Sequence, residues 1–298
     1  MTVMPIRDVH LFVKVIGQGY PLVLMHGGLG LDHTTLLPLS PLADRFTLIF
    51  YDHRCNGRSV GADVATMTWE NLTADADALR QELGFEEWGV LGHSFGGHVA
   101  LEYALRYPQR LSRLVLLDTC GDARWSQDNA PELLAKRGFS AADVQTARRF
   151  YNGQMAPDEV LPAALRLARA YEYQPSLLYN PRLLSLAYQL GLGPPMTMRP
   201  EATVFGFSRL IQGWTVMDRL HEIEAPTLVM AGRHDFLFPP EHQAILADRL
   251  PNAQLELVER SGHNPQLEEP AVVIEAISRF MDTTGSVFPK KEHSVCYT

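Results

Sequence analysis

The sequence predicts an α/β protein with a mostly parallel sheet, helices on both faces and an inserted helical segment. Short, largely apolar runs such as 21–25 and 46–51 are typical of strands that are buried on both faces of a parallel sheet. Patterns typical of helices alternate with these runs, as in repeated strand–helix–strand units. This alternation stops between about residues 122 and 220, where an insertion is expected.

The first part of the predicted core covers residues 1–121. An alternating run predicts a strand over 11–16, and Gly17-Gln18-Gly19 turns the chain into the next strand. Thr68 is a typical N-cap for a helix that continues to Leu83, with apolar side chains on one face. The other expected elements are strands over 21–25, 46–51 and 113–118, a strand that ends near Leu91, and helices over 34–43 and after Ser94.

Residues 122–220 form the predicted insertion, which we interpret as a mostly helical lid. They contain no apolar strand, and turn signals such as Asn152-Gly153 separate the helical patterns. A helical subdomain without contact to the site is the open alternative. The expected helices cover 131–137, 141–151, 158–171 and 181–190.

The second part of the predicted core covers residues 221–282. Apolar runs predict strands over 225–232 and 254–258, and helices are expected over 240–250 and 270–281. The remaining residues, 283–298, form a polar tail that is expected to be poorly ordered.

Composition limits the classes of partner. The 298-residue chain has a formal net charge of −8, which argues against a polyanionic partner such as nucleic acid. Three scattered cysteines suggest neither a disulfide framework nor a zinc site, and they favour a reducing, cytoplasmic compartment. The N-terminus has no signal-peptide pattern, and no run is long enough to span a membrane. We expect a small-molecule substrate and no membrane partner, and the oligomeric state stays open.

The stretch Gly92-His93-Ser94-Phe95-Gly96 follows an apolar run and precedes a helical pattern. A nucleophilic serine at the tip of a sharp strand-to-helix turn needs small neighbours two residues away on each side. The turn exposes the Ser94 hydroxyl and directs the amide of Phe95, at the helix N-terminus, toward a developing oxyanion. Ser94 is therefore the predicted nucleophile, and an ordinary glycine-rich turn is the simpler alternative.

A serine nucleophile needs a base and an acid that orients the base, and both should follow the carboxyl ends of strands. His263 meets this condition in the turn after the last predicted strand. Asp235 follows the strand before it and is the first choice as the acid. Asp118, after the strand that follows Ser94, is the competing acid.

Other polar residues at strand ends receive structural interpretations. His26 is expected to shape the loop that it begins, and His98 to pack or line the pocket. His234 is assigned no role. Asp52 is expected to form a structural ion pair with Arg54 or Arg58.

The order Ser94, Asp235, His263 is the order of an α/β-hydrolase triad. The chain resembles the lid-bearing α/β-hydrolase-fold proteins over nearly all of residues 8–282. The resemblance depends on His26-Gly27-Gly28-Leu29-Gly30, Tyr51-Asp52-His53-Arg54-Cys55-Asn56-Gly57-Arg58-Ser59, Gly92-His93-Ser94-Phe95-Gly96-Gly97, Gly232-Arg233-His234-Asp235 and Gly262-His263. It implies an oxyanion hole made by the amides of Phe95 and Gly28, with Leu29 as the fallback. Leu29 and His93 are expected to contact the substrate, and no metal or organic cofactor is implied.

Within this superfamily the sequence is similar to proline iminopeptidases and to esterases. The iminopeptidase likeness comes from the His-Gly-Gly start and from Thr68-Trp69, but Leu29 stands where that family usually has proline, and Phe95 where it has tryptophan. An iminopeptidase also needs lid carboxylates, for which Glu172 and Glu201 are candidates.

The predicted function is cleavage of a small ester, lactone or amide through an acyl-enzyme. An iminopeptidase-like activity and carbon–carbon bond hydrolysis are the enzymatic alternatives. A non-catalytic binding protein of the same fold is the alternative from another class.

Overall fold

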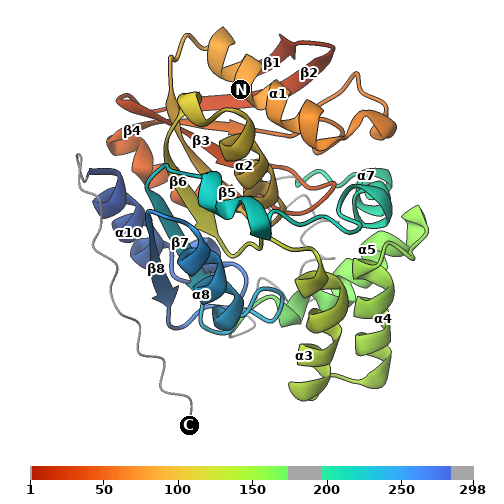
Figure 1. Ribbon diagram of the computed structural model, residues 1–298. Helices are drawn as coiled ribbons and strands as arrows, with labels where there is room; N and C mark the ends of the chain where they lie inside the picture. The colour runs from red at the N-terminus through yellow and green to blue at the C-terminus, as the bar shows by residue number, and fades with distance from the viewer. Residues whose placement is uncertain (1, 174–195, 283–298) are drawn as a thin grey trace.

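The computed structural model describes residues 2–173 and 196–282, so the helix expected over 181–190 and the tail over 283–298 lie outside the described residues. The chain forms an eight-stranded sheet in the order β1-β2-β4-β3-β5-β6-β7-β8, with helices on both sides (Figure 1). From β4 to β8 each neighbouring pair is parallel, whereas the pairs β1–β2 and β2–β4 are antiparallel. This confirms the predicted α/β fold class.

The elements have the following bounds. The strands are β1 (Thr2–Ile6), β2 (Val9–Ile16), β3 (Tyr20–Met25), β4 (Phe46–Tyr51), β5 (Trp88–His93), β6 (Leu111–Leu117), β7 (Thr227–Gly232) and β8 (Ala253–Val258). The α-helices are α1 (Trp69–Glu82), α2 (Phe95–Arg106), α3 (Ala130–Lys136), α4 (Ala141–Tyr151), α5 (Pro157–Leu167), α7 (Pro200–Phe205), α8 (Pro240–Arg249), α9 (Pro265–Glu268) and α10 (Pro270–Asp282). Shorter helical turns of other types cover 33–44, 64–66, 108–110, 125–129, 168–170, 206–210 and 217–222.

Each parallel strand contributes side chains to two cores, one on either face of the sheet. In β3, Val23 and Met25 pack in the core that contains α1, α2 and α8. Leu22 and Leu24 point to the other face and pack with side chains of α10. All four side chains are fully buried, which explains why these strands have continuous apolar sequences.

Several elements differ from the prediction; α7 and α9, for example, were not expected. The helix expected over 34–43 is a 3-10 helix, His33–Asp44, that contains Pro38 and Pro41. Proline has no amide hydrogen, and a 3-10 helix aligns residues three apart, so Leu36, Leu39 and Leu42 all reach the core. Strand β1 was not expected; it lies at the edge of the sheet, where its Pro5 is tolerated.

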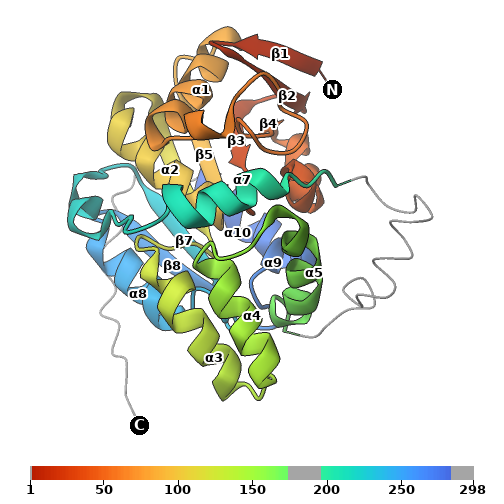
Figure 2. The same ribbon diagram turned by 90° about the vertical axis from the view of Figure 1, so that its right-hand side faces the viewer.

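The segment between β6 and β7 packs against the loops at the carboxyl ends of the strands. Helices α3, α4, α5 and α7 gather on one side of the molecule (Figures 1 and 2). The amide of Arg199 donates to the carbonyl of Gly30 at 2.7 Å, and the amide of His263 donates to the carbonyl of Tyr171 at 2.7 Å. The segment therefore contacts the loops after β3 and β8.

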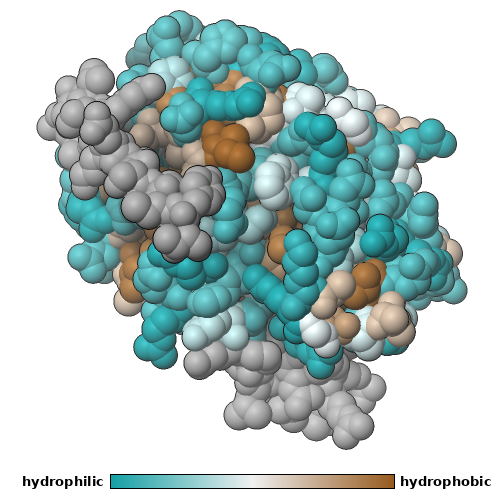
Figure 3. All heavy atoms as spheres, turned by 60° about the horizontal axis from the view of Figure 1, so that its bottom comes forward, coloured by the Kyte–Doolittle hydropathy of each residue, from teal (hydrophilic) through white to brown (hydrophobic). Residues whose placement is uncertain are grey.

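The exposed apolar side chains are scattered. On the face in Figure 3, hydrophilic residues predominate among the described atoms, and hydrophobic residues form small separate patches. Leu161 and Ile245 are examples of exposed apolar residues, and isolated ones are usual on protein surfaces. Among the helices of residues 2–173 and 196–282, none has both the length and the apolar character of a membrane span.

Candidate active site

Ser94 occupies a strained turn between β5 and α2. Its backbone angles are φ 53° and ψ −121°, a region that residues with side chains rarely adopt. A side chain at Gly92 would collide with the backbone of Gly96, and one at Gly96 would collide with the carbonyl of Met25. The Ser94 hydroxyl makes no capping bond to α2. The local sequence thus builds a sharp turn that leaves this hydroxyl available to another partner.

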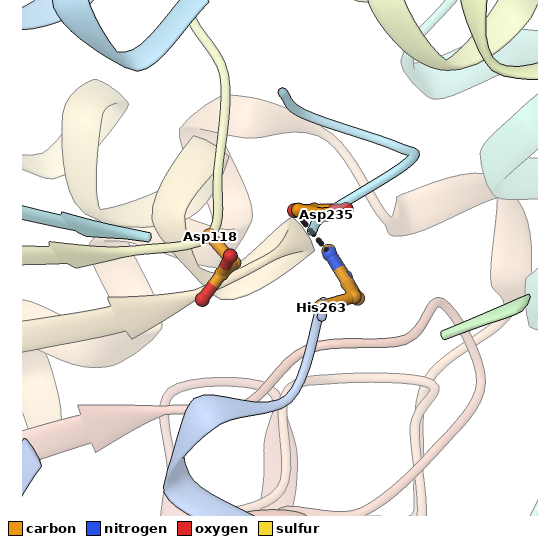
Figure 4. A group of neighbouring side chains, drawn as sticks. All are labelled: Asp118, Asp235 and His263. Carbon is orange, nitrogen blue, oxygen red and sulfur yellow. Dashed lines mark hydrogen bonds and ion pairs between the residues drawn. The ribbon is translucent and has the colours of Figure 1, made fainter. Parts of the chain in front are cut away.

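That partner is His263. Its Nε2 lies 2.9 Å from Ser94 Oγ, and its Nδ1 lies 2.8 Å from Oδ2 of Asp235. Asp235 follows β7 and His263 follows β8, and both side chains are buried. Figure 4 shows the imidazole directed at the Asp235 carboxylate. The structure therefore brings together the three residues that the sequence nominated as nucleophile, base and acid.

The main chain of His263 is held from two sides. Its amide donates to the carbonyl of Tyr171, and its own carbonyl accepts from Nε2 of His93 at 3.0 Å. The rings of His93, Tyr171 and Phe238 surround the imidazole at centroid distances of 5.2, 5.4 and 5.5 Å. His93 thus braces His263 by a backbone contact, and its expected contact with substrate stays a prediction.

Burial and charge set the protonation of the groups around the triad. Burial by itself would raise the pKa of Asp235, but the charge and hydrogen bond of His263 outweigh it and hold that pKa below its usual value. Burial, and next the proximity of His263, lower the pKa of His93 to about 3. His93 is therefore neutral near pH 7, so the Nε2–H that it donates to the His263 carbonyl fixes its tautomer.

The loop after β3 lies against the nucleophile turn. A Cβ on Gly27 would lie 2.7 Å from His93 Nδ1 and 2.9 Å from Ser94 Cβ. Gly28 has φ +70°, which favours glycine, and its carbonyl accepts from the amide of Leu31 at 3.1 Å. Phe95 is the first residue of α2, so its amide is at the positive end of the helix. The assignment of the Gly28 and Phe95 amides to an oxyanion hole stays a prediction that this proximity supports.

Leu29 is held by the inserted segment. Its carbonyl accepts from Oγ1 of Thr203 at 2.5 Å, and its buried side chain packs against Gly206. The next amide in the loop, that of Gly30, donates to Oδ1 of Asn56 at 2.5 Å. Thr203 and Asn56 could not be assigned a role from the sequence, because their contacts join segments that are far apart in it.

Asp118 lies beside Asp235 without replacing it. One carboxylate oxygen from each of these residues and a ring nitrogen of His263 all lie within 4.8 Å of one another. This is the only group of potential metal ligands among residues 2–173 and 196–282. Both ring nitrogens of His263 are already engaged, by Asp235 and Ser94, so the set fits a triad better than a metal centre.

Of the two partners expected for Asp52, the Arg54 side chain binds elsewhere. Asp52 forms no ion pair with Arg54, whose guanidinium binds Asp75. Instead, Asp52 accepts from Nδ1 of His33 at 2.6 Å and from the amide of Arg58 at 2.9 Å. Asp52 directly follows β4, and these contacts fix the loop that begins at Asp52, so its role is structural, as expected.

The other histidines and carboxylates singled out in the sequence make the following contacts. Nε2 of His26 accepts a hydrogen bond from the amide of His53 at 3.1 Å, which agrees with a role in shaping the loops at this edge. His98 packs against Trp214, and His234 stacks on Tyr173. Of the two carboxylate candidates, Glu172 is buried with its backbone against Gly262, whereas Glu201 is exposed in the first turn of α7.

Comparison with known proteins gives one consistent result. Residues 20–270 match the family described as alpha/beta hydrolase fold. A proline iminopeptidase of Clostridioides difficile is 28% identical, over 94% of this chain and 97% of that protein. The Mycobacterium tuberculosis protein Rv2715 is 30% identical, over 91% of this chain and 78% of its own. Among solved structures, a thermophilic esterase of Thermogutta terrifontis is 25% identical with a TM-score of 0.69, over 94% of this chain and 96% of that one.

Proposed function

The chain belongs to the alpha/beta hydrolase fold family, and from that premise we propose that it is a serine hydrolase that cleaves a small carboxylic ester, lactone or amide. The observation that carries this proposal is the continuous contact from Ser94 Oγ through His263 to Asp235, at 2.9 and 2.8 Å. These are the distances at which a serine hydroxyl can transfer its proton to an imidazole.

In the proposed reaction, Ser94 Oγ attacks the substrate carbonyl while His263 Nε2 takes its proton. Asp235 keeps the imidazole oriented and stabilises its positive charge. The amides of Phe95 and Gly28 donate to the oxyanion of the tetrahedral intermediate. His263 then protonates the leaving group, and a water molecule hydrolyses the acyl-Ser94 ester through the same steps.

The surroundings of the triad favour an uncharged substrate. Tyr171 and Phe238 flank the imidazole, and Phe236 packs against Tyr171 with ring centroids 5.2 Å apart. Aromatic rings bind apolar groups and offer no positive counter-charge to an anionic one. The buried free thiol of Cys120 agrees with the reducing cytoplasmic compartment that we propose for the enzyme.

Labelling with a fluorophosphonate tests the nucleophile, because this probe reacts only with an activated serine. We expect labelling of the wild-type chain and none of Ser94→Ala. Turnover of p-nitrophenyl butyrate, a caprolactone and a simple amide then ranks the bond types. A folded wild-type protein that neither reacts with the probe nor turns over any ester, lactone or amide would contradict the proposal.

An aminopeptidase of the proline iminopeptidase type is the second candidate. It is supported by the 28% identity to such an enzyme over nearly the whole chain and by Glu172, a buried carboxyl group beside the His263 loop. If Glu172 binds a substrate amino group, Glu172→Gln raises KM for a proline-amide fluorophore and leaves p-nitrophenyl butyrate turnover unchanged. Glu201→Gln, at an exposed position, is the matched control. Absence of proline-amide turnover in the wild type eliminates this candidate.

A further inference from the structure

Asp118 is a buried acid that forms no ion pair within residues 2–173 and 196–282. It follows β6 with φ +42°, a strained conformation for a residue with a side chain. Its amide donates to the carbonyl of Met230 at 2.8 Å, and its Oδ1 accepts from the amide of Gly232 at 2.9 Å. These two bonds pin the residue across the ends of β6 and β7 and turn its carboxyl group toward Asp235.

The second oxygen of this carboxyl group has no donor. Oδ2 of Asp118 is buried and lacks a hydrogen-bond partner among the described residues. Asp235, by contrast, has both oxygens occupied, Oδ1 by the amide of Leu237 at 2.7 Å and Oδ2 by His263. A buried carboxylate oxygen without a donor is costly, whereas a protonated one can itself donate.

We propose that Asp118 is a positioning residue that carries a proton on Oδ2 and donates it in a hydrogen bond to the carboxylate of Asp235. Two carboxyl groups this close in a buried site do not both ionise, and the pair shares one proton. Asp235 keeps the negative charge because His263 and the Leu237 amide stabilise it. Asp118 keeps the proton because the Gly232 amide is the only hydrogen-bond donor to its carboxyl group in the described part of the chain. This inference rests on the proposed triad.

The charges around the pair agree with this division. Burial, and next the charge of Asp235, raise the pKa of Asp118 well above its usual value. Glu268, on α9, adds a further negative charge that acts in the same direction. Asp235 instead has the imidazole of His263 as its hydrogen-bond partner, and the guanidinium of Arg137, which directly follows α3, also interacts with it electrostatically. In Figure 4, Asp118 comes from the end of β6 and lies on the side of Asp235 that is opposite the loop containing Asp235.

The consequence for the reaction is a less basic and more rigid Asp235. A neutral donor withdraws part of the carboxylate's charge and fixes the plane that faces His263. Loss of the donor makes Asp235 a stronger partner for the imidazolium, so the acid limb of the pH–rate profile moves to higher pH. We expect this shift in Asp118→Ala, with kcat reduced about tenfold or more and KM little changed, because hydrogen bonds to charged groups are the stronger ones.

Asp118→Asn is the conservative rescue, because an amide N–H can replace the carboxyl proton in a group of the same shape. It should restore kcat and the acid limb that Asp118→Ala loses. A purely structural role would lower thermal stability in both variants without moving the acid limb. Equal damage in Asp118→Asn and Asp118→Ala, with both folded, overturns the proposal, since it would mean that the ionised form is needed.

Infrared spectroscopy tests the proton directly and does not depend on any turnover. At pH 7 the wild type should show the carbonyl band of a neutral carboxylic acid, shifted in D₂O and lost in Asp118→Asn. Asp52→Asn is the control, since Asp52 is a buried acid whose pKa is lowered by His33 despite the opposing effect of burial. Its removal should leave the band unchanged. A band that persists in folded Asp118→Asn overturns the proposal, whereas a protein without esterase activity but with this band contradicts only the proposed function.

Discussion

The sheet core and the inserted segment 122–220 contribute different kinds of groups to the site. The segment contains no histidine, although the whole chain has 11. It reaches His263 through a backbone carbonyl and an aromatic ring, both of Tyr171. The core supplies Ser94, His263 and the two aspartates. The difference suggests that the core carries the chemistry and that the segment shapes the space for the substrate, as proposed for a lid.

The charged groups of the segment are also of another kind. Asp143 binds Arg166 and Arg169, and Glu159 binds Arg149, in pairs with partly exposed side chains. Such pairs contribute little stability and respond to salt. In the core, Arg54 and Asp75 are completely buried around a bidentate contact. Variants in the two regions should therefore differ in both the size and the nature of their effects.

The largest expected effect belongs to a core residue. Ser94→Ala should abolish turnover, and loss of a triad serine costs on the order of 10⁶ in kcat in a well-dissected case. The fold should persist, because the Ser94 hydroxyl makes no capping bond. Ester hydrolysis and a thermal melt measure the two properties. Substantial turnover by folded Ser94→Ala would place the nucleophile elsewhere and break the division between the two regions.

The next effect separates the two core aspartates. Asp235→Asn should lower kcat by about 10⁴, the cost when an amide replaces a triad acid and the histidine tautomer changes. Asp118→Asn should lower kcat by far less, because Asp118 contacts neither Ser94 nor His263 by a hydrogen bond among the described residues. Esterase kinetics and melting temperatures of both variants test this. The reverse order of effects would assign the acid to Asp118.

The core was predictable because its strands are buried on both faces. Apolar runs at 21–25 and 46–51 leave few alternatives to a parallel sheet, and reactive residues after such strands meet at one edge. The turn that carries Ser94 could be predicted from the sequence for a steric reason, because Gly92 and Gly96 have no room for side chains. The 3-10 helix also had a signal, in Pro38 and Pro41, that favours it over an α-helix.

The contacts that depend on register could not be read from the sequence. The bond from His93 to the His263 carbonyl joins residues 170 positions apart. The pairing of Asp118 with Asp235 requires the register in which Leu117 of β6 lies beside Met230 of β7, which no local pattern specifies. Tyr171 acts through its carbonyl, which every residue has. The members of the triad could be predicted from residue type, whereas the contacts that hold them in place could be found only in the folded structure.

The loss of folding stability between pH 7.5 and 5.5 should come from buried histidines of the core. Burial lowers the pKa of His93, His98 and His242 to about 3, and that of His26 and His53 below its usual value. Below the ordinary histidine pKa of about 6.5 the unfolded chain binds protons that the folded chain does not, so stability falls as pH decreases. Below that pKa, each such histidine lowers the free energy of unfolding by about 1.4 kcal/mol per pH unit. Urea unfolding at pH 7.5 and 5.5 measures the loss.

A single variant sharpens this test. His98→Phe should reduce the loss between pH 7.5 and 5.5 by about one histidine's share, because a phenyl ring can pack against Trp214 without binding a proton. His221→Asn, at an exposed position, is the control and should leave the loss unchanged. Hydrogen exchange should show that acid weakens the sheet before it weakens the contacts within the segment. An unchanged pH dependence in folded His98→Phe would contradict this account.

The smallest effect is expected from a segment residue, Tyr171→Phe. The variant keeps the carbonyl that binds the His263 amide and the ring beside the imidazole, and it loses only the hydroxyl contact with Tyr151 at 2.6 Å. One neutral hydrogen bond contributes about 1 kcal/mol, so kcat/KM should change by less than about tenfold. The change should appear as a different preference among acyl groups, with the acid limb of the pH–rate profile unmoved. Tyr151→Phe removes the other hydroxyl of the pair and should have a similar effect. A loss of about 10³ or more in kcat for Tyr171→Phe would mean that its hydroxyl takes part in the reaction, and the segment would then share the chemistry that we assign to the core.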